Sequence, residues 1–173
     1  CVATRAVPLV LQALSGQGSS FYLKVVGGGP ALEGWKRQAE RLGVGGQVEF
    51  LGPQPKQKLP ALYQEADLFV FPALRDSGGS ALLEAMEQGL PVLCFPWGGP
   101  AEMVDEKTGF LVSLQNPDQT VQDIRTAMRQ VRLDPEEAFQ RAQRARARVA
   151  EKFSWEEKRA LLATTYEELI PTP

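Results

Sequence analysis

The sequence predicts an α/β fold of the doubly wound, Rossmann-like class, in which helices cover both faces of a parallel sheet. Up to residue 116, short apolar segments of strand length alternate with amphipathic segments of helix length. Turns rich in glycine and proline follow the apolar segments. From about residue 117 onward the pattern is helical only. These observations predict one domain over residues 1–173 with a helical tail.

The strands are predicted from apolar runs that turn residues bound on both sides. The first run ends at Gly-Gly-Gly-Pro, and the second is followed by Gly-Pro-Gln-Pro. The predicted strands cover residues 21–26, 48–51, 68–71, 91–95 and 109–112.

The helices are predicted from apolar residues spaced three and four apart, together with start and stop signals. Gly43 ends one amphipathic run, and Ser154 with Glu157 forms a capping box. The predicted helices cover residues 7–14, 31–42, 58–65, 80–88, 101–104, 118–132, 135–151 and 154–169.

The stretch from Asp76 to Val92 follows one predicted strand and leads into another. Two adjacent glycines let its backbone turn tightly and approach a ligand. The first free amides of the helix that follows would face an anion with the helix dipole behind them. We therefore predict a phosphate site at the helix start, formed by Gly78, Gly79, Ser80 and Ala81.

Two carboxylates flank this predicted site. Glu84 lies about 7 Å further along the helix axis, roughly the step from a diphosphate to the sugar of its nucleotide. Asp76 lies in the preceding loop, where it could accept hydrogen bonds from ligand hydroxyls. Two plainer interpretations stay open: Asp76 or Ser77 caps the helix, and Glu84 is a solvated surface residue.

Composition excludes several kinds of chemistry. The chain has no histidine, which removes Ser-His-Asp and Cys-His catalysis and the commonest metal ligand. The net charge of −2 gives no general electrostatic reason to bind nucleic acid. Cys1 and Cys94 suggest neither a disulfide framework nor a metal site, so we expect a cytoplasmic protein. No segment approaches the roughly 18 apolar residues that cross a bilayer, which leaves peripheral membrane contact open.

The central stretch resembles a family signature. Its acid, seven intervening residues, Glu and then Ala-Met-x-x-Gly-Leu-Pro-Val resemble the retaining glycosyltransferases of family GT4, in the carboxy-terminal half of their GT-B fold. The first acid is usually Glu, and Asp76 matches the Asp-Ser-Gly-Gly variant that part of the family carries. Further matches follow in order at 25–30, 48–52, 62–67, 98–102, 108–112 and 153–155, and at Tyr166.

The resemblance implies a domain that binds a UDP-, GDP- or ADP-sugar, with no cofactor and no essential metal. It assigns Glu84 to the ribose hydroxyls and Asp76 to the hydroxyls of the transferred sugar, and we take these two as the catalytic pair. The acceptor, a saccharide or lipid, would be bound by an amino-terminal domain, without which we expect no transfer. The other expected donor contacts are Arg5, Gly28, Gly29, backbone near Gln54, and the helix start at 78–81.

The resemblance fails at the amino terminus. Family members open this domain with a strand ending near Gly-Arg, followed by Lys-Gly, whereas Arg5 and Ala6 stand where Lys-Gly would be. We therefore expect the sheet to lack its first strand, which would lie between the strands at 21–26 and 68–71.

Two other functions stay open. One is a non-catalytic phosphate- or nucleotide-binding module of flavodoxin or receiver type, although neither Asp67 nor Asp76 has the position of a receiver's phosphorylated Asp. The other is a sugar-nucleotide epimerase of GT-B type.

Two features of the sequence are expected to be structural only. The arginines between 141 and 148 are interpreted as a solvated helix face rather than a lipid or nucleic-acid site, because acidic residues flank them. Core or edge packing is expected for Trp35, Trp97 and Trp155.

Overall fold

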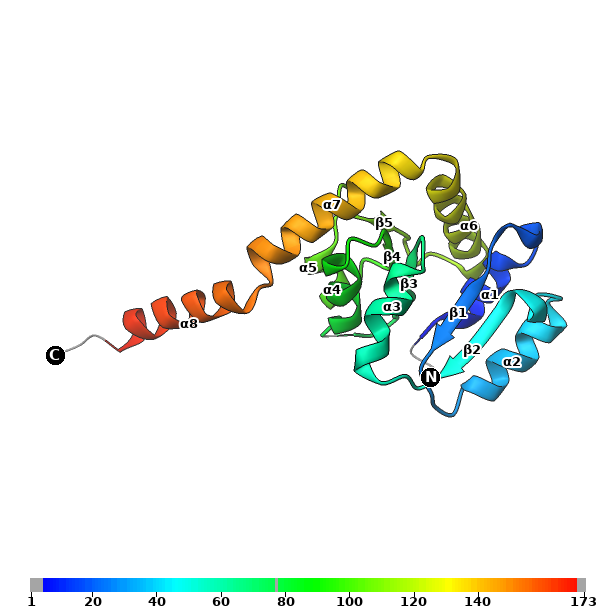
Figure 1. Ribbon diagram of the computed structural model, residues 1–173, viewed down its shortest axis with the longest axis horizontal. Helices are drawn as coiled ribbons and strands as arrows, with labels where there is room; N and C mark the ends of the chain where they lie inside the picture. The colour runs from blue at the N-terminus through cyan, green and yellow to red at the C-terminus, as the bar shows by residue number, and fades with distance from the viewer. Residues whose placement is uncertain (1–4, 77, 171–173) are drawn as a thin grey trace.

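The computed structural model describes residues 5–76 and 78–170, and its strands form two parallel sheets (Figure 1). One sheet pairs β1 with β2, and the other has the order β3-β4-β5. The predicted α/β class is confirmed, and each predicted strand is present within a few residues of its expected bounds. The strands are β1 (Leu23–Val26), β2 (Val48–Gly52), β3 (Phe69–Phe71), β4 (Val92–Cys94) and β5 (Phe110–Leu111).

No ladder joins β1 to β3 in the described part of the chain, so the doubly wound sheet is divided where its first strand was expected. The amino-terminal segment meets the end of β3 instead. Arg5 forms an isolated antiparallel bridge with Ala73, and the Ala6 amide donates to the Pro72 carbonyl at 2.7 Å. That a further strand belongs between β1 and β3 stays a prediction.

Three helices begin at a side-chain cap, of which only the cap at Ser154 was predicted from the sequence. Asn116, Asp134 and Ser154 each accept a hydrogen bond from the amide three residues later, at the starts of three successive helices. The helices are α1 (Val7–Leu14), α2 (Leu32–Arg41), α3 (Leu59–Gln64), α4 (Ser80–Glu87), α5 (Gly99–Met103), α6 (Pro117–Leu133), α7 (Pro135–Lys152) and α8 (Trp155–Leu169).

Strand β4 separates two apolar cores. Val92 and Cys94 belong to the core that also holds Leu82 of α4, whereas Leu93 and Phe95 belong to the core that holds α1 and α6. This division follows from the alternation of side chains along a strand. Burying one such side chain contributes roughly 1.5–3 kcal/mol, so β4 is fixed from both faces. The Cys94 thiol is fully buried, which raises its pKa to about 12, and Cys1 lies outside the described residues.

The arginines of α7 hold the loop between α5 and β5. Arg141 donates to the carbonyls of Glu106 and Gly109, and Arg144 donates to that of Lys107. Arg148 donates to the Glu102 carbonyl at 3.0 Å and forms an ion pair with the neighbouring loop. The expectation of a plain solvated face is therefore wrong for the partly buried Arg141 and Arg148, whereas Arg144 is exposed as expected and also contacts this loop. They serve as backbone hydrogen-bond donors, which no local pattern reveals.

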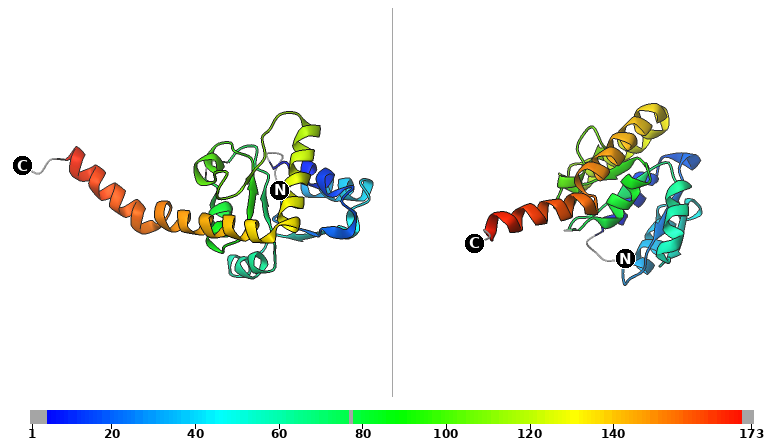
Figure 2. Two further views of the ribbon diagram at one scale, coloured as in Figure 1. Left: turned by 90° about the horizontal axis from the view of Figure 1, so that it is seen from above. Right: turned by 60° about the vertical axis from the view of Figure 1, so that its left-hand side comes forward.

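Helix α8 extends away from the rest of the protein (Figures 1 and 2). Its described residues are all exposed, including Trp155 at 82%. The packing expected for Trp155 is thus wrong, whereas Trp35 is buried as expected. Among the described residues, none of the helices combines the length and the apolar character needed to span a membrane.

Candidate functional site

The loop between β3 and α4 has a conformation that requires glycine. Gly79, the residue before α4, has a φ of +52°, in the left-handed region. A Cβ atom at this position would lie 2.9 Å from the sulfur of Met103 in α5. The predicted tight turn is therefore present, and it brings the start of α4 against α5.

The Asp76 carboxylate lies at the start of α4. Its Oδ1 accepts hydrogen bonds from the amides of Gly78 at 2.9 Å and Gly79 at 2.7 Å. Its Oδ2 forms an ion pair with Nη2 of Arg5 at 2.5 Å. The hydrogen bond from Gly79 is the largest cause that lowers the pKa of Asp76 below its usual value; partial burial opposes it, and Arg5 and Gly78 lower the pKa further. These hydrogen bonds come from Gly78 and Gly79, which precede α4, so Asp76 orders the loop before the helix and does not cap the first turn; Ser77 lies outside the described residues.

Arg5 is fixed on two sides. Its guanidinium lies over the Phe71 ring, 4.7 Å from the ring centroid, and pairs with Asp76. Its Nη1 is buried and has no hydrogen-bond partner among the described residues. A buried cationic donor without a partner is costly, and the ion pair with Asp76 offsets part of that cost.

The first-turn amides of α4 are only partly used. The amide of Gly79 donates to Asp76, while those of Ser80 and Ala81 have no acceptor among the described residues. Leu82 and Leu83 already donate to the Gly79 carbonyl. Gly78 also donates to Asp76, so two of the four predicted phosphate-binding amides are available at the positive end of the helix.

Glu84 lies half-buried on α4, one turn beyond these amides. Its Oε2 accepts a hydrogen bond from the Tyr63 hydroxyl of α3 at 3.2 Å. Burial, together with the Glu84 charge, raises the pKa of Tyr63 to about 12, so the phenol stays protonated and donates. The plainer interpretation of Glu84 as a fully solvated residue is wrong, and sequence reasoning missed Tyr63 because it lies 21 residues away.

The turn after β4 closes the site on its other side. Gly98 has a φ of +66°, and a Cβ there would lie 2.8 Å from the Asp76 carbonyl oxygen. That carbonyl accepts a hydrogen bond from the Gly99 amide at 3.0 Å. The Gly-Gly pair at the start of α5 therefore packs directly against the Asp76 backbone.

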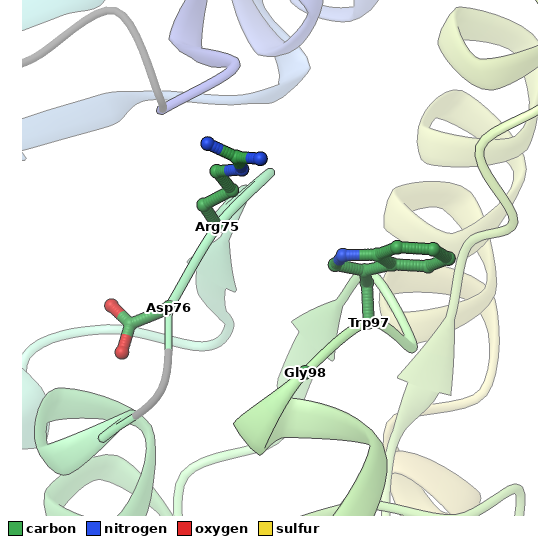
Figure 3. A pocket seen from close by; sticks show the side chains of 4 residues that line it. All are labelled: Arg75, Asp76, Trp97 and Gly98. Carbon is green, nitrogen blue, oxygen red and sulfur yellow. The ribbon is translucent and has the colours of Figure 1, made fainter.

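An open hollow of about 580 Å³ lies between these two loops (Figure 3). Trp97 stands on one side and Arg75 on the other, and the Asp76 carboxylate is turned away from Trp97. The packing expected for Trp97 is wrong, because 64% of this residue is exposed. The one sequence signal for its role was its position in a glycine turn at the end of a strand. The residues that line the hollow are Arg75, Asp76, Trp97 and Gly98.

The remaining predicted contacts lie on the other sheet. Gly28 follows β1, and a Cβ there would lie 2.9 Å from the Pro53 ring. Gln54 follows β2 and donates from its side chain to the Leu51 carbonyl at 2.7 Å. Gly29 has a φ of +139° and accepts a hydrogen bond from Leu32 at the start of α2. The predicted residues thus form two groups, one at the end of each sheet.

Metal ligands do not cluster at either group. In residues 5–76 and 78–170, no three acidic or cysteine side chains come together as a metal site would require. That donor binding needs no metal stays a prediction.

Comparison with known proteins identifies the family. A family model described as "Glycosyl transferases group 1" matches residues 2–148. A D-inositol 3-phosphate glycosyltransferase from Corynebacterium urealyticum is 33% identical over 153 residues, which cover 84% of this chain and 35% of that protein. A GDP-mannose-dependent alpha-(1-6)-phosphatidylinositol monomannoside mannosyltransferase from Mycolicibacterium smegmatis is 35% identical over 149 residues. The match covers 82% of this chain and 38% of that protein. The chain thus spans about a third of the length of these relatives.

The fold has solved counterparts. Anabaena HepE in complex with UDP superposes with a TM-score of 0.84 at 22% identity, covering 96% of this chain and 46% of that one. Such a likeness confirms the Rossmann-like arrangement of a GT-B glycosyltransferase. With the matching family model, it confirms the resemblance found in the stretch from Asp76 to Val92, and the chain belongs to the family of glycosyl transferases group 1.

Proposed function

We propose that this chain is the donor-binding domain of a retaining glycosyltransferase that takes a sugar from a nucleoside diphosphate sugar. One observation carries the proposal: Arg5, the Asp76 carboxylate and the open amides of α4 converge at the end of β3. In open α/β sheets, ligands bind outside the carboxyl ends of the strands. A diphosphate at this position would meet the positive end of a helix and a fixed guanidinium.

The chemistry requires stabilisation of a leaving diphosphate. Negative charge grows on the diphosphate as its bond to the sugar breaks, and preorganised donors aimed at that charge lower the barrier. The amides of Ser80 and Ala81 would be such donors, and the Arg5 guanidinium, paired with Asp76, would add positive charge beside them. No histidine is needed for this step, because the departing group is already a weak base.

Glu84 would bind the ribose. The Tyr63 hydroxyl donates to Oε2, whereas Oε1 has no donor among the residues that the structure describes and would accept from the ribose hydroxyls. Asp76 would accept from hydroxyls of the transferred sugar, and its hydrogen bonds to Gly78 and Gly79 hold it in one orientation. Gly28, Gly29 and backbone near Gln54 would complete the nucleotide contacts from the other sheet.

The names of the relatives suggest candidates for the nucleotide, the sugar and the acceptor. One is named for GDP-mannose, one for D-inositol 3-phosphate, and one structural neighbour contains UDP. These names support a UDP- or GDP-linked sugar as donor and a hydroxylated acceptor such as a saccharide or lipid headgroup, and an ADP-linked sugar stays a further candidate donor. Since the relatives are about three times as long as the matched region, a separate amino-terminal domain would bind the acceptor.

Calorimetric titration with UDP, GDP and ADP tests the proposal. One diphosphate should bind clearly better than the others, and Glu84→Ala should weaken it about ten- to a hundredfold, because a partly buried charged hydrogen bond is lost. Glu87→Ala is the matched control, since Glu87 is exposed on the same helix. Equal effects of the two changes, or no binding of any diphosphate, would reject the site.

Binding should not depend on a divalent metal. Helix amides and Arg5 supply the positive field, so excess EDTA should leave the dissociation constant of the diphosphate unchanged within about twofold. A collapse of affinity on adding EDTA would instead mean that Asp76 holds a cation.

A further inference from the structure

Trp97 is a large aromatic side chain that is exposed to solvent at the edge of the hollow. It lies in the turn between β4 and α5, and 64% of its surface is accessible. An indole facing water at the wall of a hollow presents an apolar, electron-rich face to any ligand that enters. Trp155 is even more exposed, but it lies on α8, outside this hollow.

The turn that carries Trp97 is held on both sides. The Trp97 amide donates to the carbonyl of Phe95, a fully buried residue, at 2.8 Å. The next residue, Gly98, has no room for a side chain because its Cβ position is 2.8 Å from the Asp76 carbonyl oxygen. The indole is therefore presented from a fixed backbone, and a ligand that stacks on it has little backbone disorder to remove.

The opposite wall of the hollow supplies polar donors. Arg75 is exposed and has no ion pair among the residues that the structure describes. Figure 3 shows its guanidinium and the indole on opposite sides of the same open space. An aromatic face on one side and a donor fork on the other suit a ring with a C–H face and hydroxyls on its rim, which describes a pyranose.

We propose that Trp97 determines specificity by stacking on the transferred sugar of the donor, while Arg75 donates hydrogen bonds to the hydroxyls of that sugar. This inference rests on the proposed function. Asp76 borders both the start of α4 and the hollow, so the hollow adjoins the position proposed for the diphosphate and is the space next to it that a tethered sugar would enter. The indole would favour a sugar whose facing side carries only C–H bonds.

The test compares diphosphates with the corresponding nucleotide sugars. UDP-glucose, GDP-mannose and ADP-glucose are titrated calorimetrically beside UDP, GDP and ADP, and the nucleotide that binds the wild-type chain is used for the variants. Trp97→Ala and Trp97→Leu should raise the dissociation constant of the nucleotide sugar about three- to tenfold and that of the diphosphate less than twofold. Trp97→Phe should restore most of the loss, because it keeps an aromatic face. Trp155→Ala is the matched control and should change neither constant.

Fluorescence gives a second, independent readout. The nucleotide sugar should change tryptophan emission in the wild-type chain and in Trp155→Phe, but not in Trp97→Phe. Equal weakening of diphosphate and nucleotide sugar in Trp97→Ala would overturn the inference, and so would no weakening of either. Those outcomes would leave the proposed function intact, whereas failure of every diphosphate to bind the wild-type chain would overturn both.

Discussion

The two sheets are covered to different extents. Every position of β4 is fully buried, between one core with α4 and α7 and another with α1 and α6. In β1, by contrast, Val25 is buried while Lys24 and Val26 are exposed. An ion pair of 2.7 Å between Lys24 and Glu65, the residue after α3, lies at this exposed side.

This difference in covering coincides with the distribution of the candidate site residues. Arg5, Asp76, Glu84 and Trp97 all lie around the three-stranded sheet, whereas Gly28 and Gln54 follow the two-stranded one. Groups that must hold a diphosphate and a sugar in fixed geometry need rigid secondary structure to support them. Under the proposed function, the well-covered sheet would carry the reacting part of the site, and we expect substitutions around it to cost more stability than substitutions around the other sheet.

The largest difference in stability between a substitution at one sheet and a substitution at the other is expected in the core beside β4. Phe95→Ala should lower the free energy of unfolding by about 3–5 kcal/mol, since it leaves a cavity in a fully packed region. Val26→Ala, at a residue 42% exposed on β1, should cost less than about 1 kcal/mol. Urea unfolding followed by circular dichroism measures both. Similar losses would mean that the two sheets are equally important for stability.

The next difference concerns the glycine turn after β4. Gly98→Ala should cost about 2–3 kcal/mol of stability, because a side chain meets the Asp76 carbonyl and the positive φ is strained. Gly46→Ala, before β2, should stay within about 0.5 kcal/mol, since a Cβ there meets no atom within 4 Å. Thermal unfolding of the two variants is the measurement. A harmless Gly98→Ala would show that the Asp76 loop and the turn before α5 are not packed as described.

A smaller effect is expected where α7 supports α5. Arg148→Met removes an ion pair of 2.9 Å to Asp105 and a hydrogen bond to the Glu102 carbonyl, which should cost about 1–3 kcal/mol. Arg146→Met is the matched control on the same helix, because Arg146 is exposed and forms no ion pair among the described residues. Hydrogen exchange should also accelerate at residues 102–109 in the first variant only. Unchanged exchange there would mean that the arginines of α7 do not hold the loop.

The smallest expected effect concerns how the stability of the folded chain depends on pH. The pKa of Asp76 is lower in the folded chain than its usual value of about 3.9, so its stabilising contribution is present above that value and is lost as the pH falls through the lowered pKa. Asp76→Asn should therefore reduce the loss of stability between about pH 5 and the acid limit. Glu33, whose pKa is lowered by the exposed Lys36 on α2, is the comparison, and Glu33→Gln should leave the acid profile unchanged. Unfolding midpoints measured across this pH range distinguish the two.

Local sequence patterns were enough to predict most of the strands and helices of the fold. The strands at β1 to β5 and the helices from α1 to α8 lie where periodicity, caps and glycine turns predicted them, because these signals act between residues a few positions apart. The spacing of Asp76 and Glu84 likewise predicted a loop and a helix start, which the structure has. The family followed from the same stretch and from its ordered matches along the chain.

The contacts between distant segments were decided by tertiary structure alone. Arg5 and Asp76 are 71 residues apart, and Arg148 reaches a carbonyl 46 residues before it. The exposure of Trp97 depends on how the turn after β4 packs against the loop after β3, and the separation of the two sheets depends on which strands become neighbours. Periodicity shows which side of a helix or strand is buried, but it does not show which other segment packs against that side. These contacts could therefore be known only from the tertiary structure.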